Sequence, residues 1–141
     1  MKITQIREKD GVEALSVLDF NLLIEKIKTE IKTRPVTGLR QALHFVLPGE
    51  SCSFAGKLPK VIPAAVFGRV NGVKRMKVYN GIVELTVGPL AGKVEVDLVK
   101  KKAAELPQTM FAYMGASGNS VKIWTLFTRP DGTLPQTQAE A

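Results

Sequence analysis

The spacing of apolar residues in the first part of the chain predicts an extended segment followed by two helices. Two isoleucines lie in a short extended segment that ends at the turn signal Lys9-Asp10-Gly11. From Asp19, which suits the N-cap position, apolar side chains recur every three to four residues, the pattern of an amphipathic helix. Pro35 prevents this helix from continuing and suits the first turn of a second short helix, which carries Leu39.

The middle of the chain is predicted to be a loop followed by a short strand and two turns. Pro48–Pro63 is rich in proline and glycine and has the composition of a loop. Ala64–Phe67 has the composition of a short buried strand, and Asn71-Gly72 and Asn80-Gly81 are turn dipeptides. The basic segment Lys74–Lys77 lies between the two turns, and we expect it on a hairpin tip or a mobile loop.

The second half of the chain has the clearest pattern. Ile82–Val87 is a predicted strand, and its apolar side chains suit a central position with both faces covered. A helix is predicted over 93–106, with three lysines facing water near its C-terminal end. Strands are predicted over 109–114 and 121–127, joined by a tight turn at 115–120. The apolar stripe expected on the helix consists of Val94, Leu98, Val99 and Leu106.

This order of elements predicts the fold class. Strand, helix, strand, glycine turn and strand make a βαβ unit followed by a hairpin. We therefore expect an α+β (α/β) protein with a mixed sheet and helices packed on it. Its length of 141 residues suits a single domain over 1–141. The polar segment Gln136–Ala141 offers no core residues, so we expect the domain to be cut before its natural C-terminal end.

The charge is unevenly distributed along the chain. The formal net charge is +7, and the excess of basic residues lies within residues 1–77. Residues 51–83 contain no acidic side chain. A basic stretch of this size attracts phosphates or another acidic partner, although a solvated, solubilising surface is the alternative. The basic residues of this stretch are Lys57, Lys60, Arg69, Lys74, Arg75 and Lys77.

Composition excludes several classes of protein. Hydrophobic residues make up 45% of the chain, but the longest uncharged apolar run is far too short to span a bilayer. The single cysteine, Cys52, cannot form an internal disulfide, which favours a reducing compartment, and we expect a cytoplasmic protein. The single histidine, His44, leaves too few ligands for a zinc site or a catalytic triad.

The turn at 115–120 is a candidate phosphate site. Small residues let a phosphate approach the backbone, where amide groups and serine hydroxyls donate hydrogen bonds. Lys122 follows the turn and supplies a positive charge. A glycine-serine hairpin without a ligand is the alternative, and it is the commoner one. The phosphate-binding residues expected in and after this turn are Ser117, Gly118, Asn119 and Lys122.

Acidic and aromatic residues are weaker candidates for a functional site. Glu84 is the one carboxylate of the predicted central strand, while Glu95 and Asp97 diverge on the helix that follows. A magnesium site built from these residues alone is therefore not expected. Aromatic side chains on the last two strands offer a stacking platform for bases, but core packing is the commoner role. These aromatic residues are Phe111, Tyr113, Trp124 and Phe127.

Two runs resemble the N-terminal domain family of VirE from Bacteroides-type bacteria: Tyr79–Leu90 and, after a helix, Ala116–Trp124. The resemblance covers roughly residues 15–128. The family is similar to the catalytic module of archaeo-eukaryotic primase-polymerases, which implies an RRM- or palm-like sheet. It also implies a replication protein of mobile elements, in which a helicase-like P-loop domain commonly follows. The Ser-Gly-x-Gly-x-Lys turn of the family is matched by residues 117–122, with Ser120 in place of the second glycine.

The family's paired metal-binding aspartates fall at Thr86 and Gly88, where this chain has no carboxylate. The leading hypothesis is therefore a degenerate, non-catalytic relative that binds nucleic acid, with DNA favoured, or a nucleotide. The binding residues would be Arg69, Lys74, Arg75 and Lys77 together with the turn residues named above. The alternative is a non-enzymatic structural or regulatory domain that docks on a helicase-like domain or another protein. A third hypothesis is an active enzyme, in which Glu84 and acids from elsewhere hold magnesium or manganese.

Overall fold

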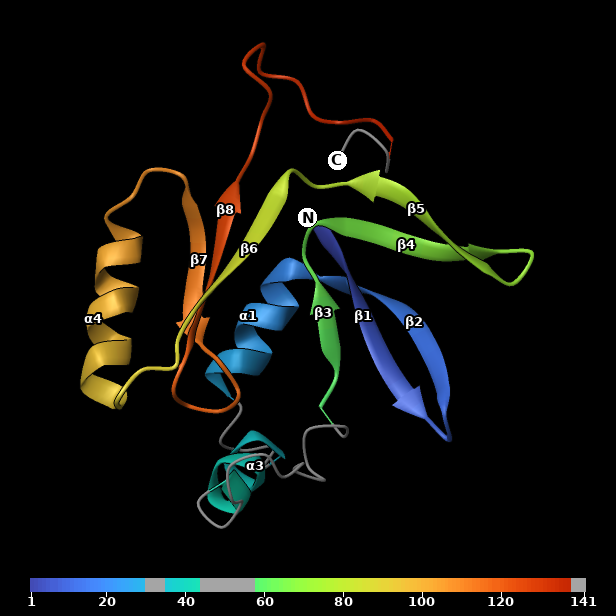
Figure 1. The fold of residues 1–141 in the computed structure, drawn as a ribbon. Helices are drawn as coiled ribbons and strands as arrows, with labels where there is room; N and C mark the ends of the chain where they lie inside the picture. Colours follow the sequence, from blue (N-terminus) through green and yellow to red (C-terminus); the bar gives the residue numbers. More distant parts are fainter. Residues whose placement is uncertain (30–34, 44–57, 138–141) are drawn as a thin grey trace. The chain divides into compact units, whose positions relative to one another are not determined.

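The computed structural model describes residues 1–29, 35–43 and 58–137 (Figure 1). The chain divides into two compact units, Met1–Ile62 and Pro63–Ala141. Predictions for His44, Cys52 and Lys57, and for the last four residues, lie outside the described residues. The described elements of the first unit are β1 (Lys2–Lys9), β2 (Val12–Asp19), α1 (Phe20–Lys28), α3 (Pro35–Leu43) and β3 (Lys60–Ile62). Those of the second are β4 (Ala65–Val70), β5 (Val73–Tyr79), β6 (Ile82–Val87), α4 (Lys93–Ala104), β7 (Thr109–Met114) and β8 (Val121–Leu126).

Helices and antiparallel sheets together confirm an α+β protein. All strand pairs among the described residues are antiparallel, so the prediction of a mixed sheet is wrong for this part of the chain. The single domain over 1–141 stays a prediction beside the division into two units. No helix among the described residues is long and apolar enough to cross a membrane.

The first unit is built on a three-stranded sheet with the order β2-β1-β3. The predicted turn after β1 is confirmed, and its residues Asp10 and Gly11 have φ values of 53° and 75°. Neither β2 nor β3 was predicted, and β3 lies within the segment expected to be a loop. A strand of only three residues is too short to show a periodic pattern of apolar side chains. Its pairing with Thr4–Ile6 of β1 is what defines it.

The two helices described in the first unit begin where the sequence predicts. The side chain of Asp19 caps α1, since its Oδ1 accepts a hydrogen bond from the backbone N–H of Asn21 at 2.9 Å. Leu23 is the buried residue of this helix. The second helix, α3, begins at Pro35, as expected for a proline in the first turn, and its Leu39 is buried.

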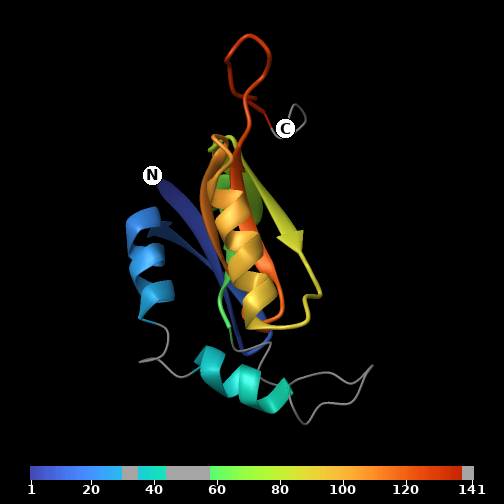
Figure 2. The ribbon, with the colours of Figure 1, turned by 90° about the vertical axis from the view of Figure 1, so that its left-hand side faces the viewer.

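The second unit contains a three-stranded sheet with the order β6-β8-β7, and α4 covers one face of it (Figure 2). Both β6 and β7 are antiparallel to β8, so they run parallel to each other, with β8 between them. The predicted succession of strand, helix, strand and hairpin is confirmed, in the form of a split βαβ unit. The finer RRM- or palm-like arrangement stays a prediction.

The prediction that Ile82–Val87 is a central strand is wrong. Within the described residues β6 is an edge strand, and its Val83, Leu85 and Val87 are 38%, 48% and 36% exposed. The central strand is β8, because the β7–β8 hairpin returns into the space between β6 and β7. Apolar content alone does not reveal this insertion, because β6 and β8 both contain β-branched residues and look alike in sequence.

The buried face of α4 also differs from the predicted stripe. Val96 and Ala103 pack with Val121 and Ile123 of β8 in one buried cluster. Val94 is 84% exposed and belongs to the opposite side of the helix. The periodicity was ambiguous because α4 has apolar residues on both sides, and only the position of the sheet selects one. Leu98 and Leu106 are likewise exposed, Val99 is half-buried, and α4 ends at Ala104.

The chain after β8 folds back on the turn between β5 and β6. Phe127 N donates to Gly81 O at 2.7 Å, and Gly81 has a φ of 67°. A Cβ at this glycine would overlap the side chain of Leu134. The chain turns between these two points, where Arg129 N donates to Thr133 O at 2.9 Å.

Candidate nucleic-acid interface

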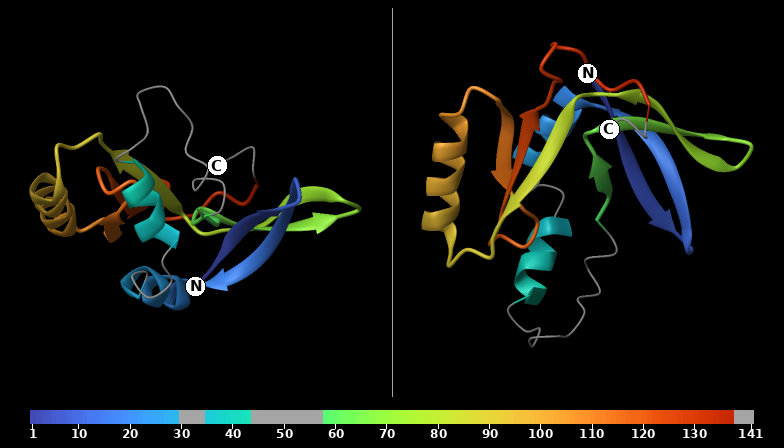
Figure 3. Two further views of the ribbon diagram at one scale, coloured as in Figure 1. Left: turned by 90° about the horizontal axis from the view of Figure 1, so that it is seen from below. Right: turned by 45° about the horizontal axis from the view of Figure 1, so that its top comes forward.

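The expected basic cluster lies on a β-hairpin. Strands β4 and β5 form a two-stranded ribbon, which Figure 3 shows in two further views. Asn71 and Gly72 join the strands with φ values of 50° and 78°, the signs that a type I′ turn requires. The segment Lys74–Lys77 is part of β5, so its predicted place on a hairpin tip or a mobile loop is wrong. The sequence of β5 does not alternate between polar and apolar residues, because basic residues lie on both faces of the strand. The strand was therefore not predicted.

Cross-strand pairing divides the four basic residues of the hairpin into two pairs, one on each face of the ribbon. Arg69 lies opposite Lys74, and the Lys74 ammonium is 5.8 Å from the centre of the Phe67 ring on the same face. Arg75 lies opposite Gly68, and the Lys77 side chain crosses this glycine on the other face. The sequence placed these residues together, but the pleat separates them by face.

All four of these side chains are exposed. The Arg69 guanidinium is held close to the turn, because its Nη1 donates to Gly72 O at 2.9 Å. Residues 58–83 contain no acidic side chain. The hairpin therefore presents positive charge on both faces with no carboxylate in its own strands to neutralise it.

The glycine-serine turn is closed by its own hydrogen bonds. Gly115 N donates to Ser120 O at 2.8 Å, and Gly118 N donates to Gly115 O at 3.0 Å. The Ser117 hydroxyl donates to Asn119 Oδ1. A phosphate would have to compete with these bonds for Ser117 and Gly118, so phosphate binding here stays a prediction.

Lys122 points away from the turn and onto the sheet face. Its Nζ donates to Glu84 Oε1 at 2.9 Å and to Thr86 Oγ1 at 2.8 Å. The second oxygen of Glu84 accepts a hydrogen bond from Trp124 Nε1 at 2.8 Å. The ammonium expected to balance a phosphate is thus already paired with a carboxylate. The sequence did not reveal this network, because these residues are far apart in the chain. The β6–β8 register brings them together.

The aromatic residues of β7 and β8 pack on one another. Phe111 and Tyr113 stack with ring centres 5.1 Å apart, and Trp124 meets both rings edge-on. Trp124 is fully buried, so it is a packing residue rather than a stacking platform. Burial raises the pKa of the Tyr113 hydroxyl well above its ordinary value, and the nearby Glu84 carboxylate raises it further.

The carboxylates that the structure describes do not gather into a metal site. Within 1–29, 35–43 and 58–137, no group of three His, Cys, Asp or Glu side chains is placed to hold a metal ion. On α4, Glu95 accepts a hydrogen bond from Ala91 N, while Asp97 pairs with Lys93 at 3.4 Å. The two side chains therefore diverge, as their spacing predicts.

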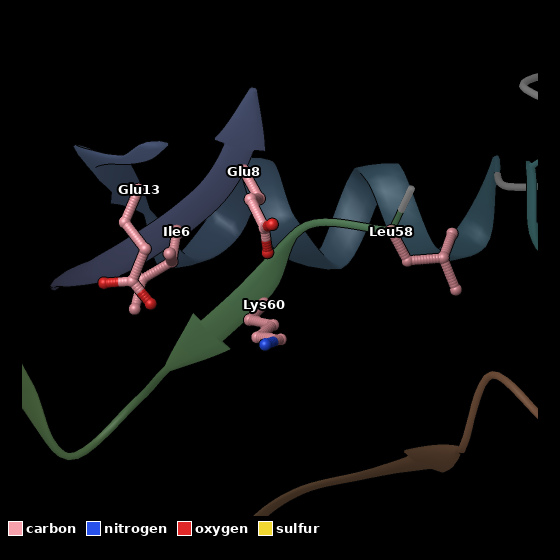
Figure 4. Close-up of a pocket in the computed structure, with 5 residues that line it drawn as sticks. All are labelled: Ile6, Glu8, Glu13, Leu58 and Lys60. Atoms are coloured by element: carbon pink, nitrogen blue, oxygen red, sulfur yellow. The ribbon is translucent and has the colours of Figure 1, made fainter. Parts of the chain in front are cut away.

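A small pocket in the first unit brings together two carboxylates that the sequence did not single out (Figure 4). Glu8 of β1 lies opposite Glu13 of β2, and Lys60 of β3 lies opposite Ile6. The two facing glutamates could have been predicted from the turn after Lys9, if the register of the two strands that it joins had been assigned. The pocket holds about 30 Å³, and its charged side chains are exposed.

The model of the family described as BT4734-like, N-terminal domain, matches residues 53–141. The chain belongs to this family. The match covers more than half of the chain and includes the basic hairpin, the β6-β8-β7 sheet and the glycine-serine turn. The BT4734-like family is of Bacteroides type, as the resemblance implied, whereas a relationship to VirE or to primase-polymerases stays a prediction. No curated protein and no solved structure matches the chain.

Proposed function

We propose that this BT4734-like domain binds duplex nucleic acid, DNA in the first place, through the β4–β5 hairpin. The observation that carries the proposal is the acid-free ribbon with exposed cations on both faces. Arg69 and Lys74 lie on one face, while Arg75 and Lys77 lie on the other. A ribbon inside a groove has a phosphate backbone on each side, so cations on both faces suit it.

Groove dimensions favour DNA over RNA. The major groove of B-form DNA is about 12 Å wide and admits a two-stranded β-ribbon. The major groove of A-form RNA is deep and too narrow for side chains to read. Binding through phosphates alone carries no sequence preference, so we expect affinity that depends on salt more than on sequence.

We also propose that the domain is a non-catalytic relative of primase-polymerases, with a palm-like β6-β8-β7 sheet. The local geometry at the two positions that lack aspartates supports this proposal. Thr86 shares the Lys122 ammonium with Glu84, so a divalent cation there would have to displace a bound positive charge. A Cβ at Gly88 would lie 3.0 Å from Asn119 O, which leaves little room for a side chain.

The salt dependence of DNA binding tests the proposed interface. A variant carrying Lys74→Ala, Arg75→Ala and Lys77→Ala is titrated with a labelled DNA duplex at several salt concentrations. The slope of log K against log salt should become shallower by about 0.9 for each phosphate contact removed. Duplex RNA of the same sequence should bind more weakly to the unchanged protein.

A matched control removes the same charge elsewhere. Lys9, Lys26 and Lys102 are exposed lysines outside the hairpin, and replacing all three by alanine lowers the net charge equally. This control variant should keep the slope of the unchanged protein. If both variants lose the same slope, DNA responds to net charge alone and the hairpin is not the interface.

A further inference from the structure

A groove of about 480 Å³ lies between α4 and β7 in the second unit. Its helix wall is formed by Asp97, Lys100 and Lys101, and its strand wall by Thr109, Met110 and Ala112. The groove is on the α4 side of the sheet, away from the Glu84–Lys122 pair, and it takes no part in the proposed contact with DNA.

The strand wall is an open sheet edge. Within the described residues β7 pairs with β8 on one side and with no strand on the other. The bond from Gly115 N to Ser120 O fixes the alternation of the hairpin, so Tyr113 bonds to β8. The backbone groups of Ala112 and Met114 therefore point outward along this edge. Unpaired N–H and C=O groups in a row form a template for an added strand.

The helix wall carries more positive than negative charge. Asp97 lies between Lys93, at 3.4 Å, and Lys100, at 4.0 Å, so its one negative charge is shared by two lysines. Lys101 forms no ion pair within the described part of the chain and is exposed. The field along this wall favours an acidic occupant.

Thr109, which lines the groove, has a hydroxyl without a partner among the described residues. Its Oγ1 atom is buried. Buried hydroxyls almost always have a partner. Because this one is covered by the protein, an incoming polar group would bond to it only after a local shift of β7. A peptide backbone supplies such groups at every residue.

We propose that the groove between α4 and β7 binds an extended acidic segment of a partner protein, which adds as a strand to the β7 edge. Its backbone would bond to Ala112 and Met114, and its alternate side chains would face the helix. Acidic residues at every second position would then reach Lys100 and Lys101. A nucleic acid lacks the regular N–H and C=O pattern that a strand edge recognises, which favours a peptide.

Titration with a short labelled peptide that alternates glutamate and valine tests this proposal. Hydrogen exchange read by NMR should show fast exchange of the Ala112 and Met114 amides in the free protein and slow exchange with the peptide. A peptide of the same composition with all glutamates at one end should bind more weakly, because its charges do not follow the strand period.

Matched lysine variants separate the groove from general charge. Lys100→Ala with Lys101→Ala should weaken binding of the alternating peptide about fivefold or more. Lys26→Ala with Lys102→Ala removes the same charge from exposed positions outside the groove walls and should leave affinity within about twofold. Equal losses in both variants would overturn the proposed position of the acidic side chains.

A second variant tests the strand edge itself. Ala112→Pro removes an N–H that points away from β8, a position where an edge strand tolerates proline. It should abolish peptide binding while Trp124 fluorescence reports an intact fold. Peptide binding that survives this variant, or exchange protection caused by single-stranded DNA instead of peptide, would overturn the proposal. Protection that grows with protein concentration alone would overturn it in favour of a second copy.

Discussion

Glu84 on β6 and Lys122 on β8 form an ion pair across the sheet, with Lys122 Nζ 2.9 Å from Glu84 Oε1. The same carboxylate accepts a hydrogen bond from the Trp124 indole N–H. It therefore connects the partly exposed Lys122 ammonium to a fully buried ring. Glu84 is therefore first of all a structural residue of the second unit. Any catalytic use of Glu84 would require release of both donors.

Replacing Glu84 by alanine should destabilise the protein. The buried indole N–H would lose a charged acceptor, at a cost of about 1–3 kcal/mol in the free energy of unfolding. Urea unfolding followed by circular dichroism measures the loss. Glu105→Gln is the matched control, because Glu105 is exposed, and it should change stability by less than about 0.5 kcal/mol. Equal effects in the two variants would mean that the network does not contribute to stability.

Replacing Thr109 by valine should stabilise the protein. The substitution removes a buried hydroxyl that has no partner in the described part of the chain, and it keeps the shape of the side chain, for a gain of about 1 kcal/mol in urea unfolding. Thr125→Val on the neighbouring strand is the control, since its hydroxyl donates to Val83 O at 3.3 Å. That variant should not gain stability. A loss of stability in Thr109→Val would show that its hydroxyl has a partner in solution.

Gly81→Ala should destabilise the protein more than Gly132→Ala. Both glycines have positive φ values, 67° and 79°, so alanine pays a backbone strain of about 1–2 kcal/mol at each. Only Gly81 also has Leu134 and Phe127 O against its missing side chain. Thermal unfolding of the two variants measures the difference. Equal midpoints would mean that the segment after β8 does not pack on this turn.

Stability should fall as pH rises above about 10, in part through Tyr113. Because its pKa is raised in the folded protein, the unfolded chain loses this proton first, and from pH 10.0 upward the folded state is progressively disfavoured. Below that pH the hydroxyl contributes no pH dependence. Tyr113→Phe should make the alkaline loss of stability shallower, measured as urea midpoints over a pH series. An unchanged series would show that Tyr113 titrates normally.

The single tryptophan, Trp124, should emit as a buried indole and be quenched only weakly by acrylamide. Adding a DNA duplex should leave both properties unchanged, because the ring is not available for base stacking. Strong quenching on DNA binding would instead place bases against the β7–β8 face. The same measurement on the denatured protein gives the exposed reference.

The sequence alone determined much of the local structure. The cap at Asp19, the helix start at Pro35 and the turn at Asn71-Gly72 follow from local chemistry, since each acts within a few residues. The two last strands and their hairpin were predictable for the same reason, because turn and alternation lie side by side in the chain.

Tertiary structure decided what depends on distant neighbours. Only the insertion of β8 between β6 and β7 makes β6 an edge, and only the sheet selects which apolar side of α4 is buried. The hairpin pleat assigns the basic residues to two faces, and the β6–β8 register brings Lys122 to Glu84. These relationships join residues far apart in sequence, so composition and periodicity fix the partners available but not which of them meet.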